Sequence, residues 1–190
     1  LITTQSYSPW RKAALFQRGL LWKLLNNNEQ AREDLVEVSV SSLKELPSFP
    51  WEELSLKGDL QQELHPSYSY VSFELGKLYF DMGDYSLATQ SFLEAKEHSE
   101  DKQEFIKAKV AYAQALVKDQ RWVKAALLLE ELARESEVAQ QTQEGYYIPE
   151  IWMDLARVKY HLGKFEESLS SYRQVFNFAP QSLVNKGDLL

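Results

Sequence analysis

The residues of this chain that could perform chemistry are few and widely separated. Its three histidines, His65, His98 and His161, lie in different parts of the sequence. The densest group of metal-ligating residue types is Glu97-His98-Ser99-Glu100-Asp101. The same five residues are typical of a solvated helix end, and we favour that interpretation because no other ligand types converge on them. We therefore predict no metal site.

Paired carboxylates do not suggest an active site either. The pairs Glu52-Glu53, Glu130-Glu131 and Glu166-Glu167 are adjacent in sequence, so their side chains point to different sides of a helix. The chain has no glycine-rich phosphate loop, no nucleophile elbow and no cysteine, which also excludes disulfides and thiolate metal sites. We predict no catalytic residue and no cofactor, and we do not expect an enzyme.

Composition narrows the class of protein. A length of 190 residues is enough for a single domain over 1–190 with a sizeable core, and 44% hydrophobic and 26% charged residues are typical of globular proteins. No apolar run is long enough to span a bilayer. The formal net charge of −7 argues against direct nucleic-acid binding, which needs clustered Lys and Arg. We expect an intracellular, cytoplasmic or nuclear, location, and from Leu1 we expect a fragment or a processed chain.

The clearest structural unit is 69–102, which is predicted to form two short helices folded back on one another. The first should run from Tyr68 to Met82 and the second from Tyr85 to His98. Gly83 and Asp84 should separate them, because glycine accepts a positive φ and aspartate caps the following helix.

Small and large side chains alternate on the faces that these two helices should bring together. Gly76 leaves a gap in the apolar face of the first helix, and Phe92 lies between Ala88 and Ala95 on the second. Such a pattern lets two helices pack closely. The residues Leu75-Gly76, Tyr79, Gly83-Asp84-Tyr85, Ala88, Phe92 and Ala95 resemble a tetratricopeptide repeat, a helical hairpin with a period of 34 residues.

The pattern returns along the chain, at 106–139, at 149–182 and, more loosely, at 12–45. In 12–45, helices are predicted from Pro9-Trp10 to Leu25 and from Glu29 to Leu46. In 106–139, Gln120-Arg121 replaces the usual turn. In 149–182, Pro149 opens the first helix, Gly163-Lys164-Phe165 makes the turn, and Ser168, Tyr172 and Val175 form the second stripe. Lys159 stands where the pattern has an aromatic residue, with Tyr160 beside it as the compensating side chain.

Two segments interrupt the period. The insertion 46–68 contains Pro47-Ser48-Phe49-Pro50-Trp51, which either engages a partner as an aromatic loop or packs as a strap against the repeats; we favour the strap because exposed tryptophan is unfavourable. The loop 140–148 is polar, with Gly145 and Tyr146-Tyr147. The tail 181–190 carries Leu183, Val184, Leu189 and Leu190, which either cover the last repeat or lead into further repeats.

The resemblance implies an all-α fold, a right-handed superhelical solenoid of about four stacked antiparallel helix pairs. It also implies a protein-interaction scaffold that holds a peptide or helix along a concave face lined by first helices. The alternatives are an architectural subunit of a protein complex and a regulatory or targeting segment of a larger enzyme.

On this reading, the concave face carries aromatic and cationic side chains that would suit a partner with apolar anchors and acidic residues. The predicted partner-binding residues are Tyr70, Phe73, Lys77, Phe80, Lys107, Gln114, Lys118, Arg157, Tyr160 and His161, with Val110 and Met153 on the same faces. Each aromatic in this set has the alternative role of packing helix against helix. Some family members clamp the C-terminal carboxylate of heat-shock chaperones with Lys and Asn; the asparagines are absent here and Phe73 occupies a position that the clamp needs polar, so we do not expect that role.

Overall fold

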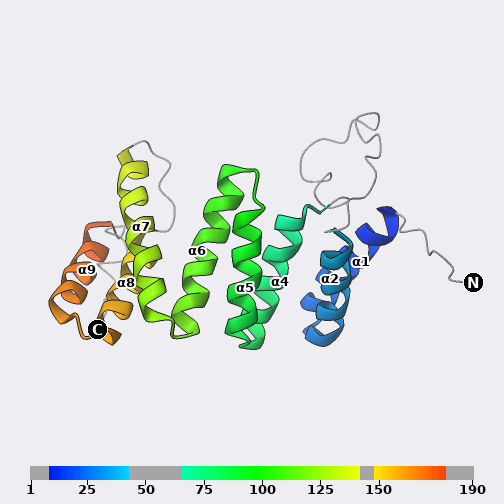
Figure 1. The fold of residues 1–190 in the computed structure, drawn as a ribbon, viewed down its shortest axis with the longest axis horizontal. Coiled ribbons are helices and arrows are strands. Elements are labelled where there is room, and N and C mark those ends of the chain that lie inside the picture. Colours follow the sequence, from blue (N-terminus) through cyan, green and yellow to red (C-terminus); the bar gives the residue numbers. More distant parts are fainter. Residues whose placement is uncertain (1–8, 43–65, 142–147, 179–190) are drawn as a thin grey trace, which may run out of the picture. The chain divides into compact units, whose positions relative to one another are not determined.

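The computed structural model describes residues 9–42, 66–141 and 148–178, and within these ranges all regular secondary structure is helical (Figure 1). The predicted all-α, repeat-built fold class is therefore confirmed. The helices are α1 (Pro9–Leu24), α2 (Asn28–Ser42), α4 (Tyr68–Met82), α5 (Tyr85–Glu97), α6 (Lys102–Lys118), α7 (Trp122–Gln141), α8 (Ile148–His161) and α9 (Phe165–Phe178). None of them combines the length and apolar character that crossing a membrane requires.

The central hairpin has nearly the predicted limits. Helix α4 runs from Tyr68 to Met82 as expected, and Gly83 ends it with φ 83° in the left-handed region that glycine tolerates. The prediction for Asp84 was wrong in one respect. It occupies the N-cap position of α5, but its side chain makes no capping hydrogen bond, and α5 ends at Glu97 rather than at His98.

Other predicted limits shift by a few residues. Helix α2 begins at Asn28, one residue early. Helix α6 starts at Lys102, ahead of the predicted segment 106–139, because the Asp101 carboxylate accepts hydrogen bonds from two backbone N–H groups of the first turn, at 2.8 and 2.9 Å. Helix α7 continues to Gln141, inside the predicted loop. The predicted strap residues, the loop residues 142–147 and the tail 181–190 lie outside the described residues.

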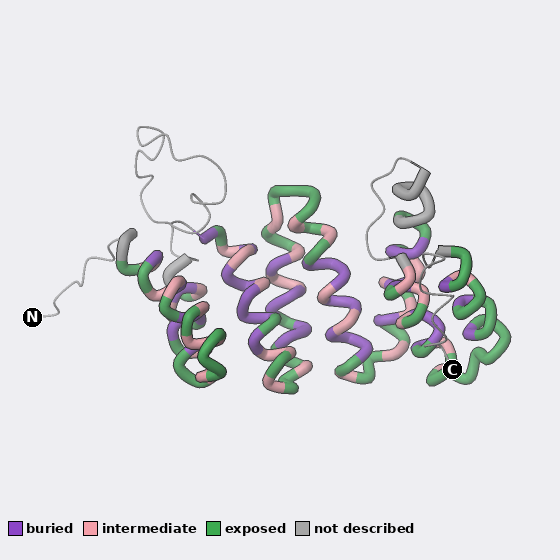
Figure 2. The backbone as a smooth tube through the Cα atoms, turned by 180° about the vertical axis from the view of Figure 1, so that it is seen from behind, coloured by how far each residue is buried: buried purple, intermediate pink, exposed green. Residues whose placement is uncertain are grey.

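Contacts divide the chain into two compact units, Leu1–Lys109 and Val110–Leu190. In the first unit, α1 pairs with α2, α4 pairs with α5, and α2 packs on α4. Side chains from α1, α2 and α4 meet in one apolar cluster. Figure 2 colours the buried residues of these helices purple along the backbone tube. The buried members of the cluster are Phe16, Ala31, Leu35, Val38, Val71, Leu75 and Leu78.

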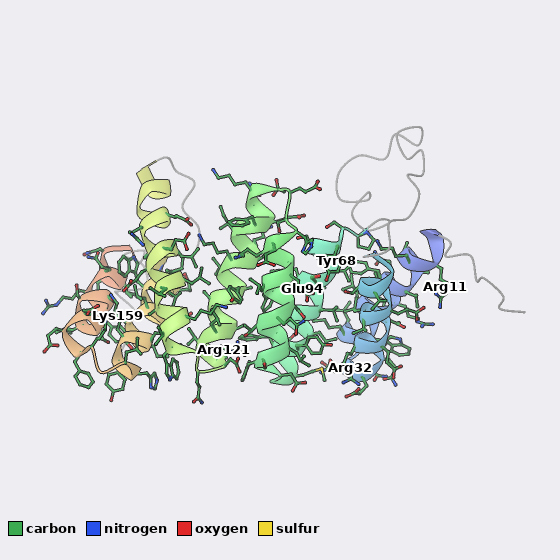
Figure 3. All side chains as sticks on the ribbon, in the orientation of Figure 1. Arg11, Arg32, Tyr68, Glu94, Arg121 and Lys159 are labelled. Carbon is green, nitrogen blue, oxygen red and sulfur yellow. The ribbon has the colours of Figure 1, made fainter. Side chains whose placement is uncertain are left out.

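The small-against-large packing predicted for the central hairpin is confirmed. Gly76 faces the ring of Phe92, and a Cβ atom on Gly76 would lie 2.6 Å from that ring. Phe92, Ala88 and Ala95 are all buried. Two polar links join the same helices. Tyr68 Oη donates to Glu94 at 2.8 Å (Figure 3), and Ser69 Oγ donates to the Ala95 carbonyl at 2.9 Å.

In the second unit α8 packs against both α7 and α9. Leu129, Leu132 and Leu155 are fully buried there, and Ser168 Oγ donates to the Ala156 carbonyl at 2.7 Å across the α8–α9 pair. This close crossing needs the small side chains found at both positions.

Lys159, which stands at a position where the repeat pattern has an aromatic residue, is accommodated by pairing with two carboxylates. The Lys159 ammonium (labelled in Figure 3) lies 3.4 Å from a carboxylate oxygen of Glu130 on α7 and 3.4 Å from one of Glu167 on α9, and the Lys159 side chain is 13% exposed. The expectation that Tyr160 compensates was wrong, because Tyr160 is 58% exposed. A buried lysine stem with a paired head takes the place of the ring.

The predicted apolar stripe of α9 is only partly correct. Ser168 and Val175 are buried, as expected, but Tyr172 is 41% exposed. The corresponding position of α7, Leu129, is 1% exposed, and α8 packs on that helix. No described helix follows α9 to cover Tyr172 in the same way.

Candidate partner-binding surfaces

The predicted partner-binding residues of α4 lie along one helix face at spacings of three and four residues. Lys77 is exposed, whereas Tyr70, Phe73 and Phe80 are half-buried. Each ring contacts another ring of the first unit: Tyr70 lies 5.5 Å from Phe16, Phe73 lies 5.6 Å from Phe92, and Phe80 lies 5.4 Å from Tyr85. These aromatics therefore pack between helices and keep a remaining edge accessible to a partner.

The cation of this face is held in place by its own helix. Lys77 Nζ lies 2.8 Å from Glu74 Oε1 and 5.7 Å from the centroid of the Phe73 ring. The Glu74 carboxylate is 8% exposed and is also approached by Lys23 at 3.7 Å. Sequence reasoning missed Glu74, although an acidic residue three positions before a basic one on a helix is a recognisable signal.

Helix α6 carries three further predicted residues. Lys107 is exposed, in the first unit, and has no ion-pair partner among the described residues. Gln114, half-buried, and Lys118, exposed, belong to the second unit. Val110, which shares the same predicted face, is buried and so is closed to a partner.

At the end of α8, four aromatic rings form a continuous series. The His161 ring stacks on Trp122 at 4.3 Å with an interplanar angle of 10°, and Tyr160 lies 5.8 Å from His161 and 5.6 Å from Phe165. Trp122 also lines a shallow pocket with Arg121, Lys124 and Leu162. Trp122 and Phe165 were not among the predicted binding residues; their position directly after each turn was the available signal.

Arg157 repeats the arrangement of Lys77. Its guanidinium donates to Asp154 Oδ1 at 2.8 Å, three residues earlier on α8, and Asp154 is 16% exposed. Both cations are thus positioned by a poorly exposed carboxylate one turn away. Such pairing restricts their rotamers and orients them before any partner arrives.

The Asp154 pair leads to a test by pH. Burial raises the pKa of Asp154, while Arg157 and Lys118 lower it and Glu150 raises it, with a net rise. The native state then holds this proton at a pH where the unfolded chain has lost it, so stability falls as pH rises from about 4 through the folded pKa. The variant Asp154→Asn has no carboxyl group to titrate, so its free energy of unfolding does not fall with pH for this reason. We therefore expect the free energy of unfolding of the variant, measured with urea and compared with wild type, to increase as pH rises through the folded pKa of Asp154. A difference that stays constant with pH, or that falls, would contradict the assignment.

The acidic group around His98 has structural roles. The His98 ring nitrogen Nδ1 lies 2.9 Å from the Glu94 carbonyl, its ring meets Tyr68 edge-on at 4.8 Å, and Asp101 caps α6. In the described ranges no three side chains of metal-ligating types come together. His98 and His161 lie in different units, and His65 lies outside the described residues.

Comparison with known proteins agrees with this architecture. A family profile described as tetratricopeptide repeat matches residues 70–102 and 149–189. The structure of MamA AMB-1 superposes with a TM-score of 0.55 at 16% identity, over 88% of this chain and 78% of that one. The Rap conjugation gene regulator of the plasmid pLS20, solved in complex with the Phr* peptide, superposes with a TM-score of 0.55 at 13% identity.

That superposition covers 87% of this chain but only 41% of the Rap regulator. No curated protein sequence matches the chain. Identities this low establish the fold alone. The profile shows that two segments of this chain, 70–102 and 149–189, are similar to tetratricopeptide repeats, within an all-α helical fold.

Proposed function

We propose that this protein is an interaction scaffold, without catalytic activity of its own, that binds a peptide or helix of a partner protein along the first helices of its repeats. The observation that carries the proposal is the shared design of α4 and α8. Each helix buries its apolar stripe and exposes a cation that is paired with a carboxylate one turn earlier. The pairs are Lys77 with Glu74 on α4 and Arg157 with Asp154 on α8.

The chemistry of these helices favours a partner with apolar anchors and acidic residues. Half-buried rings offer edges for apolar side chains, and Lys107 is a cation whose charge no described carboxylate offsets. The proposed contact residues are those of the prediction: Tyr70, Phe73, Lys77, Phe80, Lys107, Gln114, Lys118, Arg157, Tyr160 and His161. The Rap regulator, which has a similar fold, was solved in complex with the Phr* peptide, and this supports a peptide as the class of ligand.

Charge reversal on the first helices tests the proposal. Partners captured from a native extract would be identified by mass spectrometry, and their binding segment measured by calorimetry at low and high salt. Replacing Lys77, Lys107 and Arg157 together by glutamate should weaken binding roughly tenfold or more and make the remaining binding less sensitive to salt.

The matched control reverses three exposed cations that do not belong to the first helices, Lys124, Arg134 and Lys164. Both triple variants change the net charge equally, so only a local effect distinguishes them. Equal affinity of the first variant and wild type, or an equal loss in both variants, would refute the proposed surface. Co-purification with a fixed multi-subunit assembly, and with no short peptide ligand, would favour the architectural alternative.

A further inference from the structure

Helix α9 leaves an uninterrupted apolar stripe open to solvent. Phe165, Leu169, Tyr172 and Phe176 are 57%, 54%, 41% and 56% exposed. Their spacings of four, three and four residues place them on one side of the helix. The stripe extends onto α8 through Tyr160, whose ring contacts Phe165. A contiguous exposed patch of several large apolar side chains is typical of an interaction site.

In the preceding repeat, the equivalent face of α7 is covered by another helix, α8. Aligning Ser168 of α9 with Ala125 of α7 places Tyr172 at the position of Leu129 and Phe176 at that of Ala133. Leu129 and Ala133 are 1% and 2% exposed, and α8 packs on α7. The stripe of α9 therefore continues a helix-packing interface already present in the second unit, with larger side chains and no described helix over it.

The stripe is complementary to itself when reversed. In an antiparallel pair of α9 helices, Phe165 lies opposite Phe176 of the other copy, and Leu169 lies opposite Tyr172. The equal outer spacings make this match possible, since a 4-3-4 pattern reads the same in both directions. Every stripe residue then meets a large apolar side chain.

Two charges on one flank of the stripe support the same arrangement. Glu166 and Arg173 follow Phe165 and Tyr172 directly, both are exposed, and neither has an ion-pair partner among the described residues. Residues on the same flank face each other in an antiparallel pair, whereas a parallel pair separates them. Glu166 of each copy would thus oppose Arg173 of the other, and symmetry makes the contact twice.

We propose that the chain forms a homodimer in which α9 packs antiparallel against α9 of a second copy. Each large side chain at about half exposure contributes on the order of 100 Å², so α9 and Tyr160 supply roughly 500 Å² per copy, at the low end for specific interfaces. The dimer is therefore a weak one that forms at micromolar concentration. This interface is separate from the proposed partner surface on the first helices, except for Tyr160.

Sedimentation equilibrium of the 190-residue chain, from about 1 to 300 μM, measures the association directly. We expect a monomer–dimer equilibrium. Leu169→Lys should raise the dissociation constant by roughly 100-fold, because symmetry places the change at two points of the interface. The control is Leu127→Lys, which makes the same change on α7 at a residue that is 65% exposed, and it should leave the dissociation constant unchanged. Circular dichroism verifies that both variants are folded.

Exchanging charges tests the antiparallel orientation itself. Glu166→Arg and Arg173→Glu each place like charges opposite one another twice and should weaken the homodimer about tenfold. The double variant should restore wild-type association, and a mixture of the two single variants should form a heterodimer. A parallel or unrelated interface predicts neither rescue.

Several results would overturn the proposal. If the chain stays monomeric at 300 μM, no α9–α9 dimer forms. The apolar stripe of α9 is then either open or covered by residues 181–190 of the same chain. In the second case, Leu169→Lys would lower the melting temperature instead of weakening a dimer. A dimer that Leu169→Lys does not weaken forms through another surface. Species larger than a dimer indicate head-to-tail assembly and not the symmetric pair.

Discussion

Replacing Phe92 by alanine is expected to lower the free energy of unfolding by about 3–5 kcal/mol. Phe92 is 3% exposed, and its ring fills the space that Gly76 leaves on α4, with Phe73 beside it at 5.6 Å. Removing the ring takes apolar surface out of the hairpin and leaves a cavity between two helices whose backbones cannot easily close. Urea unfolding followed by circular dichroism measures the change.

A companion substitution tests whether Gly76 and Phe92 act as a pair. Gly76→Ala places a Cβ atom 2.6 Å from the Phe92 ring, so it should destabilise the wild-type protein. In the Phe92→Ala background the same methyl group enters an empty space and should stabilise, helped by the higher helix propensity of alanine. The control Leu87→Ala, on an exposed residue of α5, should change stability by less than about 1 kcal/mol. Additive effects at 76 and 92 would show that the two residues do not share one packing site.

Leu155→Ala should have a comparable effect in the second unit, about 2–5 kcal/mol. Leu155 is 1% exposed on α8, the helix that packs against both α7 and α9. Because each hairpin of a repeat protein is stabilised by its neighbours, the loss should extend beyond α8. Native-state hydrogen exchange should show reduced protection in α7, α8 and α9 together.

The matched control for this prediction is Met153→Ala on the same helix. Met153 is 37% exposed, so its truncation removes less buried surface and should cost under about 1 kcal/mol. If Leu155→Ala lowers protection in α8 alone, the three helices do not form one cooperative unit. Trp152 of the same helix is only partly buried, so its truncation should cost less than that of Phe92.

Most of the helical framework could be predicted because its signals are local. The positive φ at Gly83 and the 3.6-residue period of Leu75, Leu78 and Tyr79 depend on residues within one or two turns. The close approach at Gly76 could also be predicted, because a glycine among large residues on one helix matched a ring on the next helix in the chain.

The contacts of some individual residues could not be predicted from the sequence pattern. Lys159 was a misfit in the sequence pattern, and its carboxylate partners come from α7 and α9, 29 and 8 residues away. Asp84 has a capping residue type, yet its side chain makes no cap. Both depend on the positions of neighbouring helices and backbone groups, which residue types do not specify.

The sequence alone determined that this protein is made of helical hairpins, with tetratricopeptide-repeat similarity at 70–102 and 149–189, because helix periodicity, turn glycines and small-against-large pairs are encoded within a short stretch of chain. Only the tertiary structure decided which apolar stripes are buried. Leu129 and Tyr172 occupy equivalent places in their repeats, but α8 packs on the helix of one, while no described helix covers the other. Burial depends on what lies next to a face in space, and that is a property of the packed fold.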